Sequence, residues 1–244
     1  PHLETILLQS NCRSIKKICL TAIDAYDHIV FKAVLFDFGG VITTSPFDAF
    51  SAYENEIKAP QGFIRKINST NPDSNAWAKF ERNDISKKEF KRLFEIEASH
   101  FGQSIDADRV LKCLETTIRP KMVQLVKDLS SHYIVGILTN NLQENTDKNN
   151  DKKAGPTGHI SSVSSYVDGI FESSKLGVRK PEPKFYKIAC NTLNVEPTDC
   201  VFLDDLGINL KPAKKMGMTT IKVVNEEQAL RDIRFVLNET TGSQ

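Results

Sequence analysis

The sequence predicts an α/β protein with a doubly wound, mainly parallel sheet of the Rossmann-like kind and an inserted helical cap subdomain. Short apolar runs alternate along the chain with segments of helical periodicity, a pattern typical of parallel strands covered by helices on both faces. Several of these runs end in acidic or hydroxyl residues, which indicates polar groups at one edge of the sheet. A long stretch of helical periodicity, residues 46–119, interrupts the alternation and predicts the insertion.

The predicted strands are the short apolar runs. Strands buried on both faces of a parallel sheet have near-continuous apolar sequences, so each run is expected to lie inside the sheet. The runs are residues 32–38 (KAVLFDF), 134–139 (IVGILT), 200–204 (CVFLD) and 219–224 (TTIKVV), with a shorter one at 169–171.

Helices are predicted between the later runs. Residues 121–131 follow Pro120, a residue favoured in the first turn of a helix. Residues 183–194 carry apolar side chains at helical spacing, and residues 208–216 lead to Gly217, which is typical of a helix C-terminus.

The domain boundaries follow from this pattern. Residues 46–119 are predicted as the helical cap, and residues 32–45 and 120–244 as the core. Within the cap, Ser86 and Glu89 have the spacing of a capping box at a helix N-terminus. An insertion after the first strand is well placed to cover a site at the carboxyl ends of the strands.

Two segments fall outside this organisation. Residues 144–165 are rich in Asn, Asp, Lys, Gly and Ser, and we expect a long mobile loop there, within the core. Residues 1–31 are predicted as an N-terminal extension. Basic residues among apolar ones leave a mitochondrial targeting segment open, whereas the acidic residues of the same segment favour an amphipathic extension lying on the domain.

The composition is that of an ordinary globular protein. The chain of 244 residues is 40% hydrophobic and 26% charged, with a formal net charge of +1. A charge so close to zero implies no strong field for nucleic acid or for a membrane surface, so neither is expected as a partner. No apolar stretch approaches the roughly 18 residues of a transmembrane helix, so no stable membrane insertion is expected. The oligomeric state is left open.

The five cysteines bear on the compartment. Their number is odd and no C-x-x-C spacing occurs, which favours reduced thiols over a disulfide framework or a zinc site. We therefore expect a cytoplasmic protein, with the mitochondrial alternative open. Nucleotide-binding glycine motifs and the G-x-S-x-G and H-E-x-x-H motifs are also missing from the sequence.

Carboxylates end two of the predicted strands. Asp37 is followed by Phe38 and two glycines, and the run CVFLD ends in Asp204 with Asp205 directly after it. Two adjacent carboxylates repel each other unless a cation neutralises them, and Mg²⁺ prefers carboxylate oxygens. Each feature taken alone has a structural interpretation, as a turn at Asp37 and as a helix cap at Asp205.

Three further residues complete the candidate site. Thr139 and Asn140 end the run IVGILT and place a hydroxyl and an amide at the same edge of the sheet. Lys180 stands between glycine and proline residues just before a helix, where a fixed ammonium can meet a phosphate. An acid, Thr-Asn, Lys-Pro and Asp-Asp, in this order and each at an apparent strand end, make an improbable coincidence.

In this order the residues resemble the motifs of the haloacid dehalogenase (HAD) superfamily, whose members are mostly phosphatases. The resemblance extends over residues 32–235 and is strongest to the N-terminal phosphatase domain of soluble epoxide hydrolases and to the related domain of acyl-CoA dehydrogenase family members. The strings that carry it are VLFDFGGVI, LTNN, GVRKPEPKFY and FLDDLGINLKPAKKMGMTTIKV.

The resemblance implies a nucleophile and a metal site. Asp37 would attack phosphorus and form an aspartyl-phosphate. Mg²⁺ would be held by Asp37, the backbone carbonyl of Gly39 and Asp205. Asp204 would not bind the metal itself but would orient the residues that do.

It also implies a phosphate site and a substrate. Thr139 and Asn140 would hold phosphate oxygens, and Lys180 would neutralise charge on the transferring group. The substrate would be a small phosphorylated molecule, with the helical insertion excluding water and selecting the leaving group.

One departure leaves the function open. Most phosphatases of the superfamily carry a second Asp two residues after the nucleophile, which protonates the leaving oxygen, and this sequence has Gly39 there. The alternatives are weak turnover, a catalytically silent binding or regulatory module, or a metal-independent hydrolase of the dehalogenase type. The adjacent carboxylates at 204 and 205 argue against the last, because a metal-free site gains nothing from them.

Overall fold

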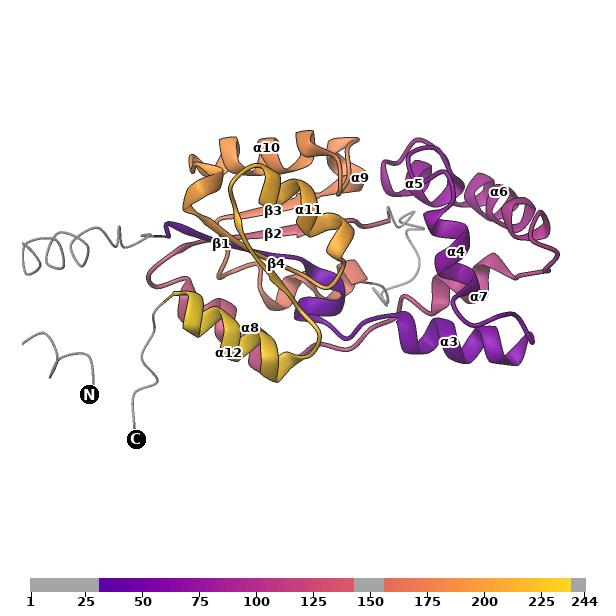
Figure 1. Ribbon diagram of the computed structural model, residues 1–244, viewed down its shortest axis with the longest axis horizontal. Helices are drawn as coiled ribbons and strands as arrows, with labels where there is room; N and C mark the ends of the chain where they lie inside the picture. Colours follow the sequence, from indigo (N-terminus) through magenta and orange to yellow (C-terminus); the bar gives the residue numbers. More distant parts are fainter. Residues whose placement is uncertain (1–30, 143–155, 238–244) are drawn as a thin grey trace, which may run out of the picture. The chain divides into compact units, whose positions relative to one another are not determined.

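The computed structural model describes residues 31–142 and 156–237. Five parallel strands form one sheet in the order β3-β2-β1-β4-β5 (Figure 1), which confirms the predicted fold class. The strands are β1 (Ala33–Phe36), β2 (Ile134–Thr139), β3 (Gly169–Glu172), β4 (Cys200–Asp204) and β5 (Thr219–Lys222).

Strand β1 lies in the middle of the sheet. All four of its residues are buried, as its continuous apolar sequence predicts. Phe36 is level with Ile137 of β2 and with Leu203 of β4. Asp37, which follows β1, therefore lies level with Asp204 at the end of β4, and its N–H donates to the carbonyl of Leu203 at 2.8 Å.

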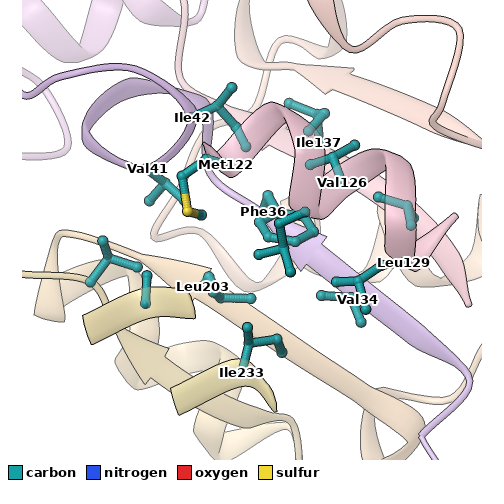
Figure 2. Packing of buried hydrophobic residues seen from close by; sticks show 14 of the residues in the cluster. Val34, Phe36, Val41, Ile42, Met122, Val126, Leu129, Ile137, Leu203 and Ile233 are labelled. Atoms are coloured by element: carbon teal, nitrogen blue, oxygen red, sulfur yellow. The ribbon is translucent and has the colours of Figure 1, made fainter. Parts of the chain in front are cut away.

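Helices cover both faces of the sheet. On one face α8 (Pro120–Leu129) and α12 (Glu226–Val236) pack over Val34 and Phe36, as Figure 2 shows. On the other face α10 (Pro183–Leu193) and α11 (Gly207–Lys215) pack over Ala33 and Leu35. The split follows from the strand geometry, because successive side chains of β1 point to opposite faces.

The ends of these helices match the sequence signals. Pro120 and Pro183 occupy the first turns of α8 and α10. Gly217 follows the C-cap residue Met216 of α11 and has a φ of 102°, a left-handed conformation that favours glycine.

The segment between β1 and α8 is helical and has a hydrophobic cluster of its own, in which the rings of Phe80 and Phe90 stack with centroids 4.6 Å apart. Ser86 caps one of its helices, where its Oγ accepts a hydrogen bond from the N–H of Glu89. The helices are α3 (Phe47–Glu56), α4 (Phe63–Ser69), α5 (Ala76–Glu81), α6 (Lys87–Ser99) and α7 (Ala107–Lys112). We refer to α3–α7 together as the cap helices.

Residues 1–30 of the expected extension and residues 144–155 of the expected loop lie outside the described residues. Residues 156–165 correct our expectation of a loop. Pro156–Ser162 form a short 3₁₀ helix, η2, and Val163 is fully buried against the α8 face of the sheet. Val163 and Ile160 pack against this core, but they stand among polar residues, so the sequence pattern did not indicate their burial. Among the helices described, none is long and apolar enough to cross a membrane.

The remaining elements are short. Segment η1 (Phe38–Ile42) follows β1, α9 (Ser173–Leu176) follows β3, and η3 (Pro197–Asp199) precedes β4.

Candidate active site

The candidate site lies where the sheet changes direction. The chain continues from β1 through the cap helices to α8 on one face, whereas β4 leads to α11 on the other face. The connections at the carboxyl ends of β1 and β4 therefore diverge and leave a crevice between them. Asp37 stands at the end of β1, and Asp204 and Asp205 at the end of β4.

Three carboxylates meet in this crevice. One oxygen from each of Asp37, Asp204 and Asp205 lies within 4.8 Å of the other two. Lys180 is buried among them, with its Nζ 2.8 Å from Oδ1 of Asp37 and 2.7 Å from Oδ2 of Asp204. One ammonium thus faces three carboxylates, and the cluster retains an excess of negative charge when all four groups are ionised.

Burial and mutual repulsion shift the ionisation of these groups. Burial raises the pKa of Asp37 well above its usual value, and the charges of Asp204 and Asp205 raise it further against the opposing effect of Lys180. Burial and the neighbouring Asp204 raise the pKa of Asp205 to about 6. Burial alone would lower the pKa of Lys180, but Asp204 and Asp37 outweigh it and the net shift is upward.

Adjacent in sequence, Asp204 and Asp205 have different surroundings. Asp204 is fully buried and accepts hydrogen bonds from Lys180, from the N–H of Leu206 at 2.8 Å and from Nδ2 of Asn209 at 3.1 Å. Asp205 is partly exposed and lines a cavity. The carboxylate of Asp204 is therefore committed to holding its neighbours, and that of Asp205 is available to a ligand.

The two glycines after Asp37 have different roles. Gly40 has a φ of 77°, and a Cβ added to it would stand 2.2 Å from Oδ2 of Asp205. Its carbonyl accepts a hydrogen bond from Nη1 of Arg119 at 2.8 Å. Gly39 has an ordinary extended conformation, and among the described residues no heavy atom lies within 4 Å of a Cβ built on it.

Thr139 and Asn140 lie at the end of β2, beside the carboxylates. Thr139 is buried. Asn140 pairs with the backbone of Lys180, because its Oδ1 accepts from the Lys180 N–H at 2.8 Å and its Nδ2 donates to the Lys180 carbonyl at 2.9 Å. The lysine is thereby held at both its backbone and its ammonium.

A cavity of about 330 Å³ adjoins these strand ends. All of the predicted site residues except Asp204 line it, and they are Asp37, Gly39, Thr139, Asn140, Lys180 and Asp205. The segment carrying the cap helices contributes the apolar residues Pro46, Phe47, Phe50, Pro72, Trp77 and Leu114 and the polar residues Arg65, Asn68, Ser69, Glu81 and Thr116.

Glu81, at the end of α5, is a site residue that sequence reasoning missed. It is buried and lines the cavity, accepting from Nε1 of Trp77 at 2.9 Å and from Nε of Arg179. Its Oε2 also lies 3.4 Å from Nδ2 of Asn140. The sequence around Glu81, FERNDIS, did not indicate this contact, because only the fold brings α5 next to Arg179.

The donor set fits a divalent cation. Carboxylate oxygens are the ligands that Mg²⁺ prefers, and a cation would neutralise the excess negative charge around Lys180. Asp37 and Asp205 both line the cavity and could reach such an ion, together with the backbone of Gly39.

Comparison with known proteins agrees with this architecture. A HAD family enzyme from Bacteroides thetaiotaomicron, solved in complex with magnesium and inorganic phosphate, superposes with a TM-score of 0.53 and 18% identity, covering 82% of this chain and 98% of that one.

Two longer relatives align by sequence. Mouse acyl-CoA dehydrogenase family member 10 is 28% identical over 225 residues, which are 85% of this chain and 19% of the relative. Pig bifunctional epoxide hydrolase 2 is 26% identical over 230 residues, which are 88% of this chain and 40% of the relative. The chain thus corresponds to less than half of either relative. The sequence profile of the haloacid dehalogenase-like hydrolases matches residues 31–217, and the chain belongs to that family.

Proposed function

We propose that this hydrolase cleaves phosphomonoesters with Mg²⁺, through an aspartyl-phosphate formed on Asp37. The observation that carries the proposal is the position of Lys180, whose single ammonium is held between Asp37 and Asp204 while Asp205 remains exposed to the cavity. A site with this excess of carboxylates favours a bound cation. A cation and a fixed ammonium together suit a phosphate.

The metal would be held by Asp37, the Gly39 carbonyl and Asp205, and it would supply positive charge beside the transferring phosphoryl group. Asp204 would keep Lys180 in place, since its oxygens are occupied by Lys180, Leu206 and Asn209.

The phosphate itself would meet Thr139, Asn140 and Lys180. These residues surround the end of β2 and line the same cavity as Asp37. Hydrogen-bond donors that are already in position stabilise the charge that develops in the transition state. The two hydrogen bonds between the Asn140 side chain and the Lys180 backbone would hold both residues in position.

The cap helices would receive the rest of the substrate. Phe47, Phe50 and Trp77 supply an apolar wall beyond the phosphate site, which suits a small phosphorylated molecule with an apolar portion.

A catalytically silent binding module is the second candidate, and one observation favours it. Gly39 has no side chain to donate a proton beside Asp37. Such a module would bind metal and phosphate without turning the ester over.

The test is phosphate release from p-nitrophenyl phosphate, with Mg²⁺ and with a chelator, by the wild type, Asp37→Asn and Asp128→Asn. Asp128 is an exposed residue of α8 and controls for the substitution itself. We expect Mg²⁺-dependent turnover that Asp37→Asn abolishes and Asp128→Asn retains. Saturable phosphate binding without turnover would establish the silent module. Release of halide from a 2-haloacid without metal would instead establish the dehalogenase type.

A further inference from the structure

The open position beside the nucleophile bears on which phosphate esters the site can cleave. We propose that the natural substrate carries its phosphate on a weakly basic oxygen, such as that of a phenol or an enol, which departs without taking a proton. The inference rests on the proposed function, because it concerns the leaving group of the same reaction.

The first observation is the space at position 39. The φ and ψ of Gly39, −69° and 130°, suit any residue, and apart from its neighbours in the chain a Cβ there would meet no described heavy atom within 4 Å. Neither strain nor crowding therefore excludes an acidic side chain from this position. What the cavity holds beside Asp37 is open space where a proton donor would fit.

The second observation is that the other ionisable groups around the cavity are engaged. Asp37 is the proposed nucleophile and Asp205 a proposed metal ligand. Lys180 donates to Asp37 and Asp204. The described residues that line the cavity and carry an ionisable side chain are Asp37, Arg65, Glu81, Arg179, Lys180 and Asp205.

Glu81 is the remaining carboxylate of this set, and both of its oxygens already accept hydrogen bonds. One oxygen accepts from Trp77, and the other accepts from the guanidinium of Arg179 and lies near Asn140. With both oxygens engaged by these donors, neither is placed to deliver a proton to a leaving group. The guanidinium groups of Arg65 and Arg179 do not release protons in proteins.

The reaction then proceeds without a proton at its first step. A carboxylate oxygen of Asp37 forms a bond to phosphorus, the bond from phosphorus to the leaving oxygen breaks, and its electron pair departs with that oxygen as an anion. A water molecule next attacks phosphorus and the bond to Asp37 breaks. The carboxylate is regenerated and both hydrogens of the water leave with the product, dihydrogen phosphate.

The rate of such a step depends strongly on the basicity of the leaving oxygen. General acid catalysis contributes about 10²–10⁴-fold to a rate, and it matters most when the leaving oxygen is strongly basic. Alkyl phosphates need this help, whereas phosphates of acidic hydroxyls do not. The site should accordingly favour the second class.

The test is kcat/KM for p-nitrophenyl, p-chlorophenyl, phenyl and benzyl phosphate, in order of rising leaving-group pKa, with Mg²⁺. This constant reports the phosphorylation of Asp37 even where the later hydrolysis limits kcat. The enzymes compared are the wild type, Gly39→Asp and Gly39→Asn, the last being the matched control, with a side chain of similar size that cannot donate a proton in this way.

We expect kcat/KM of the wild type to fall steeply along the series. Gly39→Asp should raise the ratio of kcat/KM on the benzyl ester to kcat/KM on the p-nitrophenyl ester by about 10²–10⁴-fold over the wild type. Gly39→Asn should keep the steep wild-type dependence.

A wild type that cleaves the benzyl and p-nitrophenyl esters with similar kcat/KM already has a proton donor, and that result would overturn the inference while leaving the phosphatase proposal intact. Equal gains from Gly39→Asp and Gly39→Asn would also overturn it. Failure of the wild type on every ester would instead remove the proposed function.

Discussion

The carboxylate of Asp205 occupies the space that a side chain on Gly40 would need. A Cβ on Gly40 would stand 2.2 Å from Oδ2 of Asp205, and the φ of 77° at Gly40 already favours glycine. The turn after β1 and the end of β4 therefore approach each other only because residue 40 lacks a side chain. This contact brings the cavity-facing carboxylate of β4 next to Asp37.

Gly40→Ala should separate these two strand ends. We expect Mg²⁺ affinity, measured by calorimetry, to weaken by about 10–100-fold, as it does when groups that orient metal ligands are changed. Gly62→Ala is the matched control, because Gly62 has a φ of 78° but its added Cβ would meet nothing within 4 Å. Both variants bear the left-handed backbone cost of about 1–2 kcal/mol, and only the first should lose metal. Equal Mg²⁺ affinities in the two variants would contradict this account.

Asp204→Ala should destabilise the fold. Lys180 is buried and would lose one of its two carboxylate partners. The N–H of Leu206 and the buried amide of Asn209 would also lose their acceptor, and a polar group left unsatisfied in this way costs about 1–3 kcal/mol. Urea unfolding in the absence of metal would measure the change.

Asp204→Asn is the control for that interpretation. It removes the charge but keeps an oxygen that can accept from Lys180, Leu206 or Asn209, so it should lose less stability than Asp204→Ala. If the two variants are equally destabilised, the cost arises from the lost charge and not from the unsatisfied donors.

Glu81→Gln should weaken the phosphate site from the cap side. The change removes the charge that holds Arg179 and disturbs the neighbour of Asn140. We expect the inhibition constant of inorganic phosphate to rise by roughly fivefold, equivalent to about 1 kcal/mol of coupling.

Arg82→Gln supplies the comparison. Arg82 faces Glu182 at 3.6 Å, so it links the same two segments as Glu81 and Arg179 but does not line the cavity. If Glu81 acts through Asn140, Arg82→Gln should leave phosphate inhibition unchanged. If both substitutions raise the inhibition constant of phosphate equally, Glu81 only connects the two segments and does not act on the phosphate site through Asn140.

Mg²⁺ binding should depend on pH through Asp205. Its pKa of about 6 in the metal-free protein means that protons compete with the metal below that pH. The apparent Kd for Mg²⁺ should rise as the pH falls through about 6, since binding then releases the proton of Asp205, and the raised pKa of Asp37 adds to the same trend. Asp205→Asn should bind weakly at every pH. A Kd of the wild type that does not change across pH 6 would contradict the prediction.

Asp205 also affects the stability of the metal-free protein, which should decrease as the pH rises, whereas Mg²⁺ affinity should increase. The pKa of Asp205 is raised from 3.8 to about 6 on folding, so the folded state binds the proton more tightly than the unfolded chain. The resulting stabilisation is complete below pH 3.8 and is lost as the pH rises through 6. In thermal unfolding with a chelator, the wild type should lose stability relative to Asp205→Asn between these two pH values.

The sequence by itself determined the strands and the order of the site residues. Strands β2 and β4 have the predicted bounds, because a buried parallel strand requires a continuous apolar run that is visible in the sequence. The end of each run also placed Asp37, Thr139 and the carboxylates of β4 at one edge of the sheet, since parallel strands share their direction. The short segment of η2 and Val163 was not predicted, because one buried residue and the partly buried Ile160 make no periodic pattern.

The tertiary structure alone decided which of these groups meet. Glu81 and Arg179 are 98 residues apart, and Arg119 and Gly40 are 79 residues apart, yet each pair is in hydrogen-bond contact. The packing around β4 also decides that Asp204 is buried beside Lys180 while Asp205 lines the cavity. Periodicity encodes the local backbone and the face that is buried, whereas single polar contacts across the fold follow from the packing of elements that are distant in the chain.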